Sequence, residues 1–277
     1  MKALILGISG QDGSYLAEQL TAAGHDVSGM VRRPTTARHL IQGDLLDQAS
    51  LEAALLWFRP DVVFNLAAVT APGGAWGTTQ PPLLADVTGL GVVRLLDAMV
   101  AVAPHARLLH ASSSAIYNPN RYGLYGAAKV FAHQAVAGYR ARLHCSNAIL
   151  FSHTSPRQDG RFLAPRICST LKRIKAGSDE KLVLGDVESC RDWGYAPDCM
   201  ARLVTMADEE PDDYVVATGI QHSVREFVET ALKHLGLDWD DAVRIDPAAQ
   251  HVEDEQFATG GGGMPTSFDD MIGYMVA

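Results

Sequence analysis

The chain has 277 residues, 47% of them hydrophobic, which is enough for one large core or for a core domain with a smaller companion. Its 23 Lys and Arg against 32 Asp and Glu give a formal net charge of -9, which argues against binding to nucleic acid or to an anionic membrane. We find neither a secretory leader nor an apolar run of about 20 residues, so we expect a cytoplasmic protein. The cysteine spacing, with no Cys-x-x-Cys pair, predicts neither a metal site nor a disulfide framework.

Short apolar runs alternate with longer helical patterns over the first half of the chain. The runs that we expect to form buried strands are residues 3–6, 27–31, 62–64, 108–110 and 148–151. The stretches that we expect to form helices are residues 14–23, 51–58, 91–102 and 127–142. Strands that alternate with helices imply right-handed crossovers. The sequence therefore predicts an α/β fold, with a Rossmann-like doubly wound parallel sheet in a dinucleotide-binding domain at residues 1–150.

The pattern changes after residue 151, where arginines, prolines and short elements dominate. This change predicts a smaller, substrate-binding portion over residues 151–277. A strand near residues 213–218 is expected to return to the main sheet. Residues 224–235 have the period of an amphipathic helix, and a last short helix is expected at residues 267–275.

A glycine-rich segment lies between the first predicted strand and the first predicted helix. It reads Gly7-Ile-Ser-Gly10-Gln11-Asp12-Gly13. Glycines in this strand–turn–helix context let the backbone approach a pyrophosphate, whose charge the helix N-terminus stabilises. We therefore predict that Gly7, Gly10, Gln11, Asp12 and Gly13 bind a dinucleotide cofactor.

The end of the second predicted strand indicates which dinucleotide is bound. No carboxylate stands there to bond a ribose 2′-hydroxyl, and the chain instead reads Arg32-Arg33. Two arginines suit a 2′-phosphate, so NADP is favoured over NAD. Two further segments are expected to line the cofactor, Asp44-Leu45 on the adenine side and Leu66-Ala67-Ala68 after the third strand.

A second motif, Tyr125-Gly-Ala-Ala-Lys129, has the Tyr-x-x-x-Lys spacing. On a helix, residues i and i+4 share one face, so the phenol and the ammonium point into the same site. The positive charge lowers the pKa of the phenol toward the working pH, which suits Tyr125 to act as an acid or base. Upstream, serines 112–114 end a strand, where a hydroxyl is placed to bond a reacting alcohol.

Together these segments resemble the GDP-mannose 4,6-dehydratases, a family of extended short-chain dehydrogenases/reductases. The matching segments are GISGQDGSYLAEQL from Gly7, VRR from Val31, GDL from Gly43, NLAA from Asn65, DVTGLG from Asp86, ASSSAIY from Ala111, YGAAK from Tyr125, ILFSHTSPR from Ile149, RDWGYAPD from Arg191, and DDYVVATG with SVREFVE after Asp212. The resemblance implies a fold, a cofactor and a GDP-linked sugar substrate.

The resemblance also implies residue roles. Tyr125 would take the proton of the sugar 4-hydroxyl, Lys129 would tune Tyr125 and contact the cofactor, and Ser113 would bond the same hydroxyl. His153 matches a histidine that contacts the cofactor. Arg157 and Arg191 match arginines expected to bind the nucleotide part of the substrate.

The chain departs from the family at a position that carries chemistry. Two residues beyond Ser113, where the family has a glutamate that removes the C5 proton, the chain has Ala115. A methyl group cannot act as a base. We therefore expect cofactor binding and redox chemistry at C4, whereas the elimination of water is in doubt.

Three functions stay open on the sequence. The first is a dehydratase-like enzyme acting at C4 of a GDP-hexose, and the second is a 4-epimerase or 4-ketoreductase, which needs only Ser113, Tyr125 and Lys129. The third is a non-catalytic nucleotide-binding partner protein, against which the intact Tyr–Lys pair argues.

The resemblance further implies a homodimer, formed through the helices at 91–102 and 127–142. Apolar residues there, such as Val92, Leu96 and Phe131, fit either that interface or the core.

Overall fold

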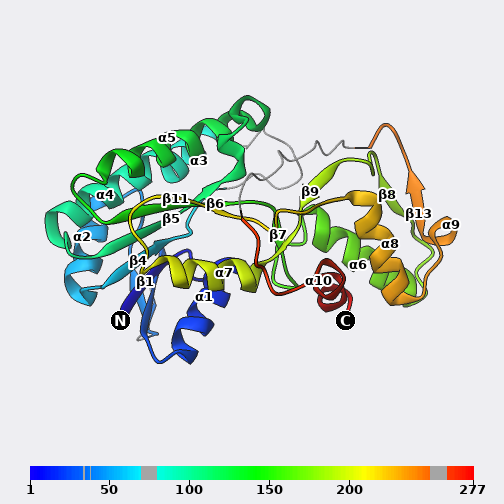
Figure 1. Cartoon of the computed structure of the whole chain (residues 1–277), viewed down its shortest axis with the longest axis horizontal. Helices are drawn as coiled ribbons and strands as arrows, with labels where there is room; N and C mark the ends of the chain where they lie inside the picture. The colour runs from blue at the N-terminus through cyan, green and yellow to red at the C-terminus, as the bar shows by residue number, and fades with distance from the viewer. Residues whose placement is uncertain (34, 38, 70–79, 250–260) are drawn as a thin grey trace. The chain divides into compact units, whose positions relative to one another are not determined.

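The structure is a computed structural model that describes residues 1–33, 35–37, 39–69, 80–249 and 261–277 (Figure 1). The described residues form two compact units, each with its own apolar core. The first unit contains the described residues of 1–69, 80–150 and 200–216. The second contains those of 151–199, 217–249 and 261–277. Each unit is described by itself below.

A parallel sheet of seven strands, counted over the described residues, forms the centre of the first unit. The strands are β1 (Lys2–Leu6), β2 (Asp26–Val31), β3 (Leu40–Gln42), β4 (Val62–Asn65), β5 (Arg107–Ser113), β6 (Cys145–Leu150) and β11 (Asp213–Val216). Their spatial order is β11-β6-β5-β4-β1-β2-β3, and every neighbouring pair is parallel. The predicted Rossmann-like α/β fold is confirmed.

Helices cover both faces of this sheet. They are α1 (Gln11–Ala22), α2 (Gln48–Phe58), α3 (Pro81–Leu84), α4 (Gly91–Val102), α5 (Gly123–Tyr139) and α7 (Ala196–Met206). Short turns η1 (Ala85–Leu90), η2 (Ser114–Ile116) and η3 (Pro119–Tyr122) precede α4 and α5. Figure 1 shows α2, α4 and α5 over one face, and α1 and α7 over the other. The core under α2, α4 and α5 is aliphatic, with Leu96, Leu108 and Val136 fully buried.

Three helices begin earlier than the sequence predicts. α1 begins at Gln11 rather than at residue 14, α2 at Gln48 rather than at residue 51, and α5 at Gly123 rather than at residue 127. Their first turns contain glycine and polar residues, which add nothing to the apolar period from which the helices were predicted. The consequence for function is that Tyr125 lies in the first turn of α5 and Asp12 in the first turn of α1.

The order of the strands determines where a ligand binds to the first unit. β1 and β4 lie side by side, and the chain continues from β1 to β2 on one side and from β4 to β5 on the other. The connections therefore diverge at the carboxyl ends of β1 and β4. In open parallel sheets, such a switch point leaves a crevice where ligands bind.

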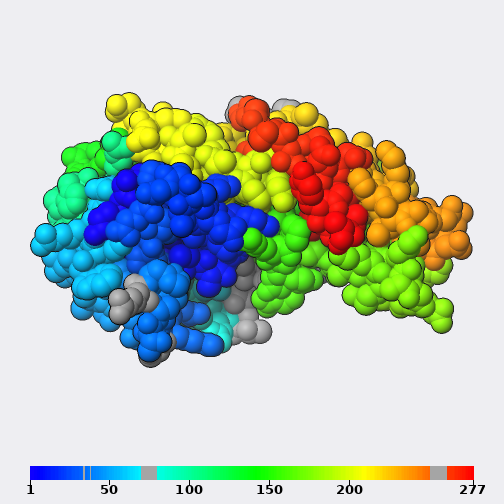
Figure 2. All heavy atoms as spheres, turned by 90° about the horizontal axis from the view of Figure 1, so that it is seen from below, coloured from blue at the N-terminus to red at the C-terminus, as the bar shows by residue number. Residues whose placement is uncertain are grey.

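The second unit contains three pairs of strands among its described residues. β7 (His153–Thr154) pairs with β10 (Gly194–Tyr195), β8 (Leu182–Leu184) with β13 (Val243–Ile245), and β9 (Cys190–Asp192) with β12 (Gln221–Ser223). Its helices are α6 (Leu163–Lys175), α8 (Val224–Leu235), α9 (Trp239–Ala242) and α10 (Phe268–Val276). Helices α6, α8 and α10 bury Ile167, Phe227 and Ile272 completely. Figure 2 shows α10, in red, at the surface of this unit.

One buried carboxylate holds a turn of the second unit against β9. Asp192 is 1% exposed, and its side chain accepts hydrogen bonds from the Thr218 backbone at 2.8 Å, the Thr218 hydroxyl at 2.9 Å and the Gly219 backbone at 2.7 Å. Hydrogen bonds to a charged group are among the stronger polar contacts in proteins. Asp192 is thus a structural anchor of the segment between β11 and β12.

Replacement of this anchor should destabilise the protein. Asp192→Ala leaves the three donors without their acceptor, and we expect the free energy of unfolding to fall by about 2–3 kcal/mol, measured by denaturant titration. The matched control is Asp186→Ala, which removes a carboxylate that accepts one hydrogen bond, from the Glu188 backbone at 2.8 Å. Equal losses in the two variants would contradict the role of Asp192.

Candidate active site

The glycine loop lies at the carboxyl end of β1 and turns directly into α1. Gly7 has a φ of +87°, a conformation that side chains other than glycine rarely adopt. The Gly10 backbone N–H donates to the Gly7 carbonyl at 3.0 Å, which closes the turn. Gly10 is the N-cap of α1, and no described side chain caps this helix end. The N-terminus of α1 therefore presents backbone N–H groups and the positive end of the helix dipole to the crevice.

Close packing is a second reason for glycine at position 7 and explains the glycine at position 13. A Cβ on Gly7 would lie 3.0 Å from the Ala67 backbone nitrogen, at the end of β4. A Cβ on Gly13 would lie 2.3 Å from the Gly7 carbonyl oxygen and 2.6 Å from the Ile8 Cα. The loop is thus a backbone cradle that any side chain would fill, and its residues fit a bound pyrophosphate.

The residues expected on the adenine side differ in their surroundings. Arg32 and Arg33 follow β2 directly and are exposed; within the described part of the chain neither forms an ion pair or hydrogen bond. Asp44 accepts a hydrogen bond from the Leu46 backbone at 3.0 Å and donates its own N–H to Ser50 at 2.9 Å. Leu45, at 4% exposure, is part of the core. Leu45 can therefore meet a cofactor through its backbone, whereas the two arginines have side chains available.

The segment Leu66-Ala67-Ala68 comes directly after β4. The Leu66 N–H donates to the Leu6 carbonyl at 3.0 Å, so this segment extends the pairing of β4 with β1. All three residues are half-buried, beside the glycine loop that Ala67 contacts. The structure thus brings the glycine loop and this segment together at the switch point.

The Tyr-x-x-x-Lys pair lies at the start of α5, against the end of β5. The Lys129 side chain is 4% exposed and donates to the Ala111 carbonyl at 2.7 Å. Its ammonium lies 5.8 Å from the centre of the Tyr125 ring. The Tyr125 phenol is hydrogen-bonded to the Ser113 side chain. Ser113 also accepts from the Ala115 backbone at 3.2 Å, which fixes its rotamer at the end of β5.

Burial dominates the protonation of this pair. It raises the pKa of Tyr125 to about 12, while the hydrogen bond from Ser113 acts in the opposite direction. Burial likewise lowers the pKa of Lys129 from 10.5 to about 8. At neutral pH the phenol therefore keeps its proton, and the lysine is close to its titration point. A positive charge bound beside the phenol would favour the phenolate.

Asp12 has an electrostatic role that the sequence did not reveal. Its negative charge raises the pKa of Lys129, opposing the effect of burial. The same charge adds to the increase in the pKa of Tyr125 that burial causes. Asp12 is held by a hydrogen bond from the Gln11 side-chain amide at 2.9 Å. Asp12 and Tyr125 are 113 positions apart in the sequence. The glycine loop and the Tyr–Lys pair nevertheless belong to one electrostatic site.

The remaining predicted residues belong to the second unit. His153 lies in β7, and its Nδ1 is 2.7 Å from the Phe151 carbonyl. Arg157 is exposed in the turn that follows, where its N–H donates to the Ser155 hydroxyl at 3.2 Å. Arg191 is half-buried in β9, and its guanidinium lies 5.8 Å from the centre of a Trp193 ring.

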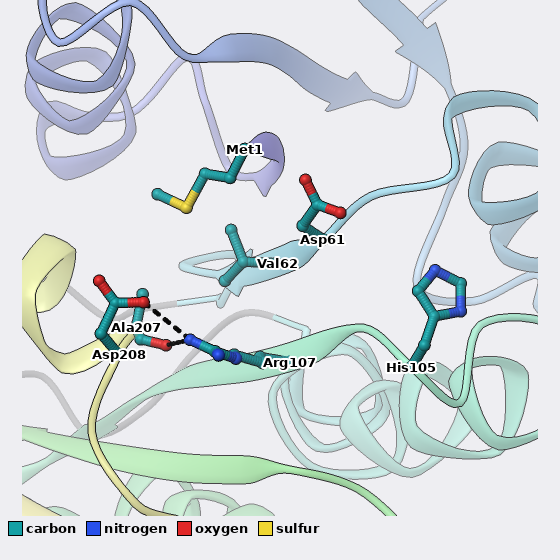
Figure 3. A pocket seen from close by; sticks show the side chains of 7 residues that line it. All are labelled: Met1, Asp61, Val62, His105, Arg107, Ala207 and Asp208. Carbon is teal, nitrogen blue, oxygen red and sulfur yellow. Dashed lines mark hydrogen bonds and ion pairs between the residues drawn. The ribbon is translucent and has the colours of Figure 1, made fainter.

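A pocket in the first unit lies away from these motifs. Its lining residues are Met1, Asp61, Val62, His105, Arg107, Ala207 and Asp208 (Figure 3). Arg107 is bound there to Asp208 at 2.8 Å and to the Ala207 carbonyl. This pocket is at the amino ends of β1, β4 and β5, whereas ligands of such sheets bind at the carboxyl ends. It is therefore separate from the candidate active site.

Comparison with known proteins assigns the chain to a family. The family model described as GDP-mannose 4,6 dehydratase matches residues 4–259. The chain belongs to the GDP-mannose 4,6-dehydratase family. GDP-mannose 4,6 dehydratase 1 of Arabidopsis thaliana is 36% identical over 281 residues, which cover 88% of this chain and 77% of that protein. The human GDP-mannose 4,6 dehydratase is 35% identical, covering 84% of this chain and 72% of the human protein.

Solved structures share the fold. A putative epimerase from Burkholderia cenocepacia superposes with a TM-score of 0.84 at 25% identity, over 99% of this chain and 96% of that one. The UDP-glucose 4-epimerase of Thermus thermophilus, solved with NAD, gives 0.80 at 22% identity, over 100% and 98%. The chain is therefore a nucleotide-sugar enzyme of the GDP-mannose 4,6-dehydratase type, with the extended short-chain dehydrogenase/reductase fold.

Position 115 is where the sequence predicts a departure from the family. Ala115 lies in η2 directly after β5, and it is 1% exposed. Its backbone N–H is engaged by Ser113. The side chain is a buried methyl group, so it offers no acid or base at this position.

No helix in the described part of this family member is both long and apolar enough to cross a membrane. No group of three or more His, Cys, Asp or Glu side chains is placed there to hold a metal ion.

The buried charge of Lys129 should lower the stability of the protein. Lys129→Met is expected to raise the free energy of unfolding at pH 7 by on the order of 1–3 kcal/mol. The loss of the hydrogen bond to the Ala111 carbonyl reduces this gain. The folded protein releases this proton near pH 8 and the unfolded chain near 10.5. The unmodified protein therefore gains stability as the pH rises between these values, and the advantage of the variant should shrink.

The measurement is denaturant unfolding at several pH values between 7 and about 10.5. Lys175→Met, which changes an exposed lysine at the end of α6, is the control and should show no such pH dependence. A loss of stability in Lys129→Met at pH 7 would show that the ammonium is better solvated than its burial indicates.

Proposed function

We propose that this protein is an NADP-dependent enzyme that transfers hydride at C4 of a GDP-hexose. The observation that carries the proposal is the meeting of Ser113, Tyr125 and Lys129 at the carboxyl end of β5, with Asp12 of the glycine loop acting on the same pair. A structural core does not need a buried lysine beside a tyrosine, because burying that charge is costly. The non-catalytic alternative is therefore disfavoured.

Each residue has one task in this proposal. When bound, the nicotinamide ring supplies the hydride acceptor. Tyr125 accepts the proton of the C4 hydroxyl, and Ser113 donates or accepts the hydrogen bond that holds that hydroxyl in place. The charge of Lys129 stabilises the phenolate form of Tyr125. The backbone of Gly7, Gly10, Gln11 and Gly13 at the start of α1 binds the pyrophosphate.

Each unit carries residues to which the family resemblance gives a binding role. The first unit binds the cofactor, with Leu66-Ala67-Ala68 and Asp44-Leu45 along it. In the second unit, the resemblance assigns Arg157 and Arg191 to the nucleotide part of the sugar and His153 to the cofactor. Arg191 supports this assignment, because a half-buried guanidinium next to Trp193 is well suited to a diphosphate.

A second candidate function is a 4-epimerase or 4-ketoreductase. The observation that favours it is the buried methyl group of Ala115. Elimination across C5–C6 needs a base for the C5 proton, whereas epimerisation and keto reduction need only Ser113, Tyr125 and Lys129. We therefore propose that hydride exchange at C4 proceeds and that the loss of water is slow.

A homodimer through α4 and α5 is also part of the proposal. Val92 and Leu96 are fully buried and belong to the core, so they are not available to a partner. Phe131 of α5 and Leu90 of η1 are about half exposed, at 50% and 45%, and remain as apolar candidates for the interface.

Product analysis tests the reaction. The purified protein, incubated with NADP and GDP-mannose or other nucleotide sugars, should form reduced cofactor or a stereoisomer of unchanged mass. Without a base at position 115, dehydration should be slower by roughly 10²–10⁴-fold than with one. Tyr125→Phe should stop turnover and leave cofactor binding intact. Rapid loss of one water from GDP-mannose would show that another group replaces the missing glutamate.

Cofactor titration tests the choice of NADP. Arg32 and Arg33 are exposed at the end of β2, so each is free to bond a 2′-phosphate, and we expect tighter binding of NADP than of NAD. Arg32→Ala with Arg33→Ala should remove this preference, at about 1.5–3 kcal/mol for each charged hydrogen bond lost. Arg142→Ala, in the turn that follows α5, is the control. Equal affinity of the unmodified protein for both cofactors would refute the assignment.

A further inference from the structure

A row of polar side chains crosses the core of the first unit beneath α5. Asn65 of β4, His110 of β5, Asn147 of β6 and Asp213 of β11 are direct partners across four neighbouring strands. The first three are at most 1% exposed. Buried polar groups are costly unless they are hydrogen-bonded, so a row of them across four strands calls for an explanation.

Hydrogen bonds connect most of the row. The Asn65 amide is 3.2 Å from the His110 Nδ1. The Asn147 amide donates to the Asp213 carboxylate at 2.8 Å and to the His133 carbonyl at 3.1 Å. Three buried atoms nevertheless have no partner among the described residues: Asn65 Oδ1, His110 Nε2 and Asn147 Oδ1. They belong to adjacent strands, and polar atoms of this kind are commonly joined by bound water.

A second set of contacts links this row to the catalytic helix. His133 is one turn beyond Lys129 on α5, on the same face. Its Nδ1 is 3.0 Å from the Ser112 hydroxyl, and its Nε2 is 3.3 Å from the Asp213 carboxylate. Lys129 itself is bound to the carbonyl of Ala111, the residue between His110 and Ser112. The lysine is thus bonded to the backbone of the strand residue that separates His110 from Ser112.

The hydrogen bonds of His133 have a direction. A carboxylate only accepts, so the Nε2–H of His133 donates to Asp213. The Nδ1 of the neutral ring is then an acceptor, and the Ser112 hydroxyl donates to it. Ser112, His133 and Asp213 have the composition of a hydrolase triad, but Ser112 is 2% exposed and no substrate can reach it. The three groups are suited to passing a proton, not to attacking a carbonyl.

The far end of the chain of groups is open to solvent. The side chain of Asp213 is 32% exposed, and it is held by Arg140 as well as by Asn147. At the near end, Lys129 is almost completely buried. Burial keeps the pKa of His110 well below its usual value, and the charges of Lys129 and His133 lower it further. His110, Lys129 and His133 are therefore close enough to interact electrostatically.

We propose that Ser112, His133 and Asp213 form a proton path from Lys129 to solvent, lined by His110 and the two buried asparagines. The proposal rests on the function proposed above, because it assigns the path to the proton that Tyr125 must lose before it can act as a base. No residue of the path touches the substrate, so these are positioning and relay groups and not catalytic residues.

The transfers balance as a sequence of proton shifts with no redox change. The Lys129 ammonium gives a proton through one water to the Ser112 oxygen, as the hydroxyl proton of Ser112 moves to His133 Nδ1. The Nε2 proton of His133 moves to Asp213, which releases it to bulk water. Neutral Lys129 then takes the phenolic proton of Tyr125. The net change is Tyr125–OH plus water to the phenolate plus hydronium, with the ring proton of His133 moved from Nε2 to Nδ1; passage of a proton in the reverse direction restores the first tautomer.

Two variants separate a relay from a structural role. His133→Gln keeps one hydrogen-bond acceptor and one donor on a planar group that cannot carry a proton. Asp213→Asn keeps the shape of the carboxylate and removes the proton acceptor. Asp212→Asn is the matched control, because Asp212 is exposed next to Asp213 and 4.0 Å from the same arginine, Arg140, and has no contact with His133.

The readout is the single-turnover rate of NADPH formation from NADP and GDP-mannose, measured by stopped flow at low and high concentrations of imidazole or formate buffer. Both variants should be slower by about tenfold or more at low buffer, and small buffer acids and bases should restore part of the rate. Asp212→Asn should match the unmodified protein and show no dependence on buffer concentration. Thermal unfolding of each variant shows whether the fold is retained.

The outcomes are distinguishable. Unmodified rates in both variants, with Tyr125→Phe inactive, would overturn the proton path and leave the proposed function standing. A slow variant with a lowered Tm and no response to buffer would also overturn it, since this is what a structural role produces. If the unmodified protein forms no NADPH from GDP-mannose or another nucleotide sugar, the proposed function fails, and the proton path fails with it.

Discussion

The ammonium group of Lys129 is held between α5 and the end of β5 by its hydrogen bond to the Ala111 carbonyl, and the rest of the site is arranged around it. A buried charge is costly, and here the nearby carboxylate of Asp12 offsets part of that cost. Because α5 is anchored at this residue, the helical period brings Tyr125 to Ser113 on one side and His133 to Ser112 on the other. The buried charge of Lys129 therefore lowers the stability of the fold while it serves the proposed chemistry, a trade-off that is common at active sites.

The second constraint is the lack of space around the glycine loop. The backbone of Gly13 approaches that of Gly7 so closely that a single methyl group would overlap it, and Gly7 meets the end of β4 in the same way. These approaches bring α1 down onto the carboxyl ends of β1 and β4. The N-terminus of α1, and with it Asp12, is thereby brought into electrostatic contact with α5. One backbone arrangement thus serves both the proposed pyrophosphate site and the tuning of the Tyr–Lys pair.

Family membership and site chemistry carry different information about this protein. The match over residues 4–259 assigns the fold and the class of enzyme. The individual reaction depends on fewer atoms, and at position 115 a buried methyl group stands beside an intact Tyr–Lys pair. The proposal that hydride moves at C4 without loss of water therefore depends on this one side chain.

The sequence by itself determined the parallel α/β sheet, the glycine turn and the Tyr-x-x-x-Lys pair, because each is encoded within a few consecutive residues by period, spacing or residue type. It did not reveal that α1 and α5 begin early, since polar and glycine-rich first turns have no apolar period. Only the tertiary structure aligned Asn65, His110 and Asp213 in one row. These residues are far apart in the chain, and the register between strands, which sets side chains opposite one another, follows from the packing of the whole sheet.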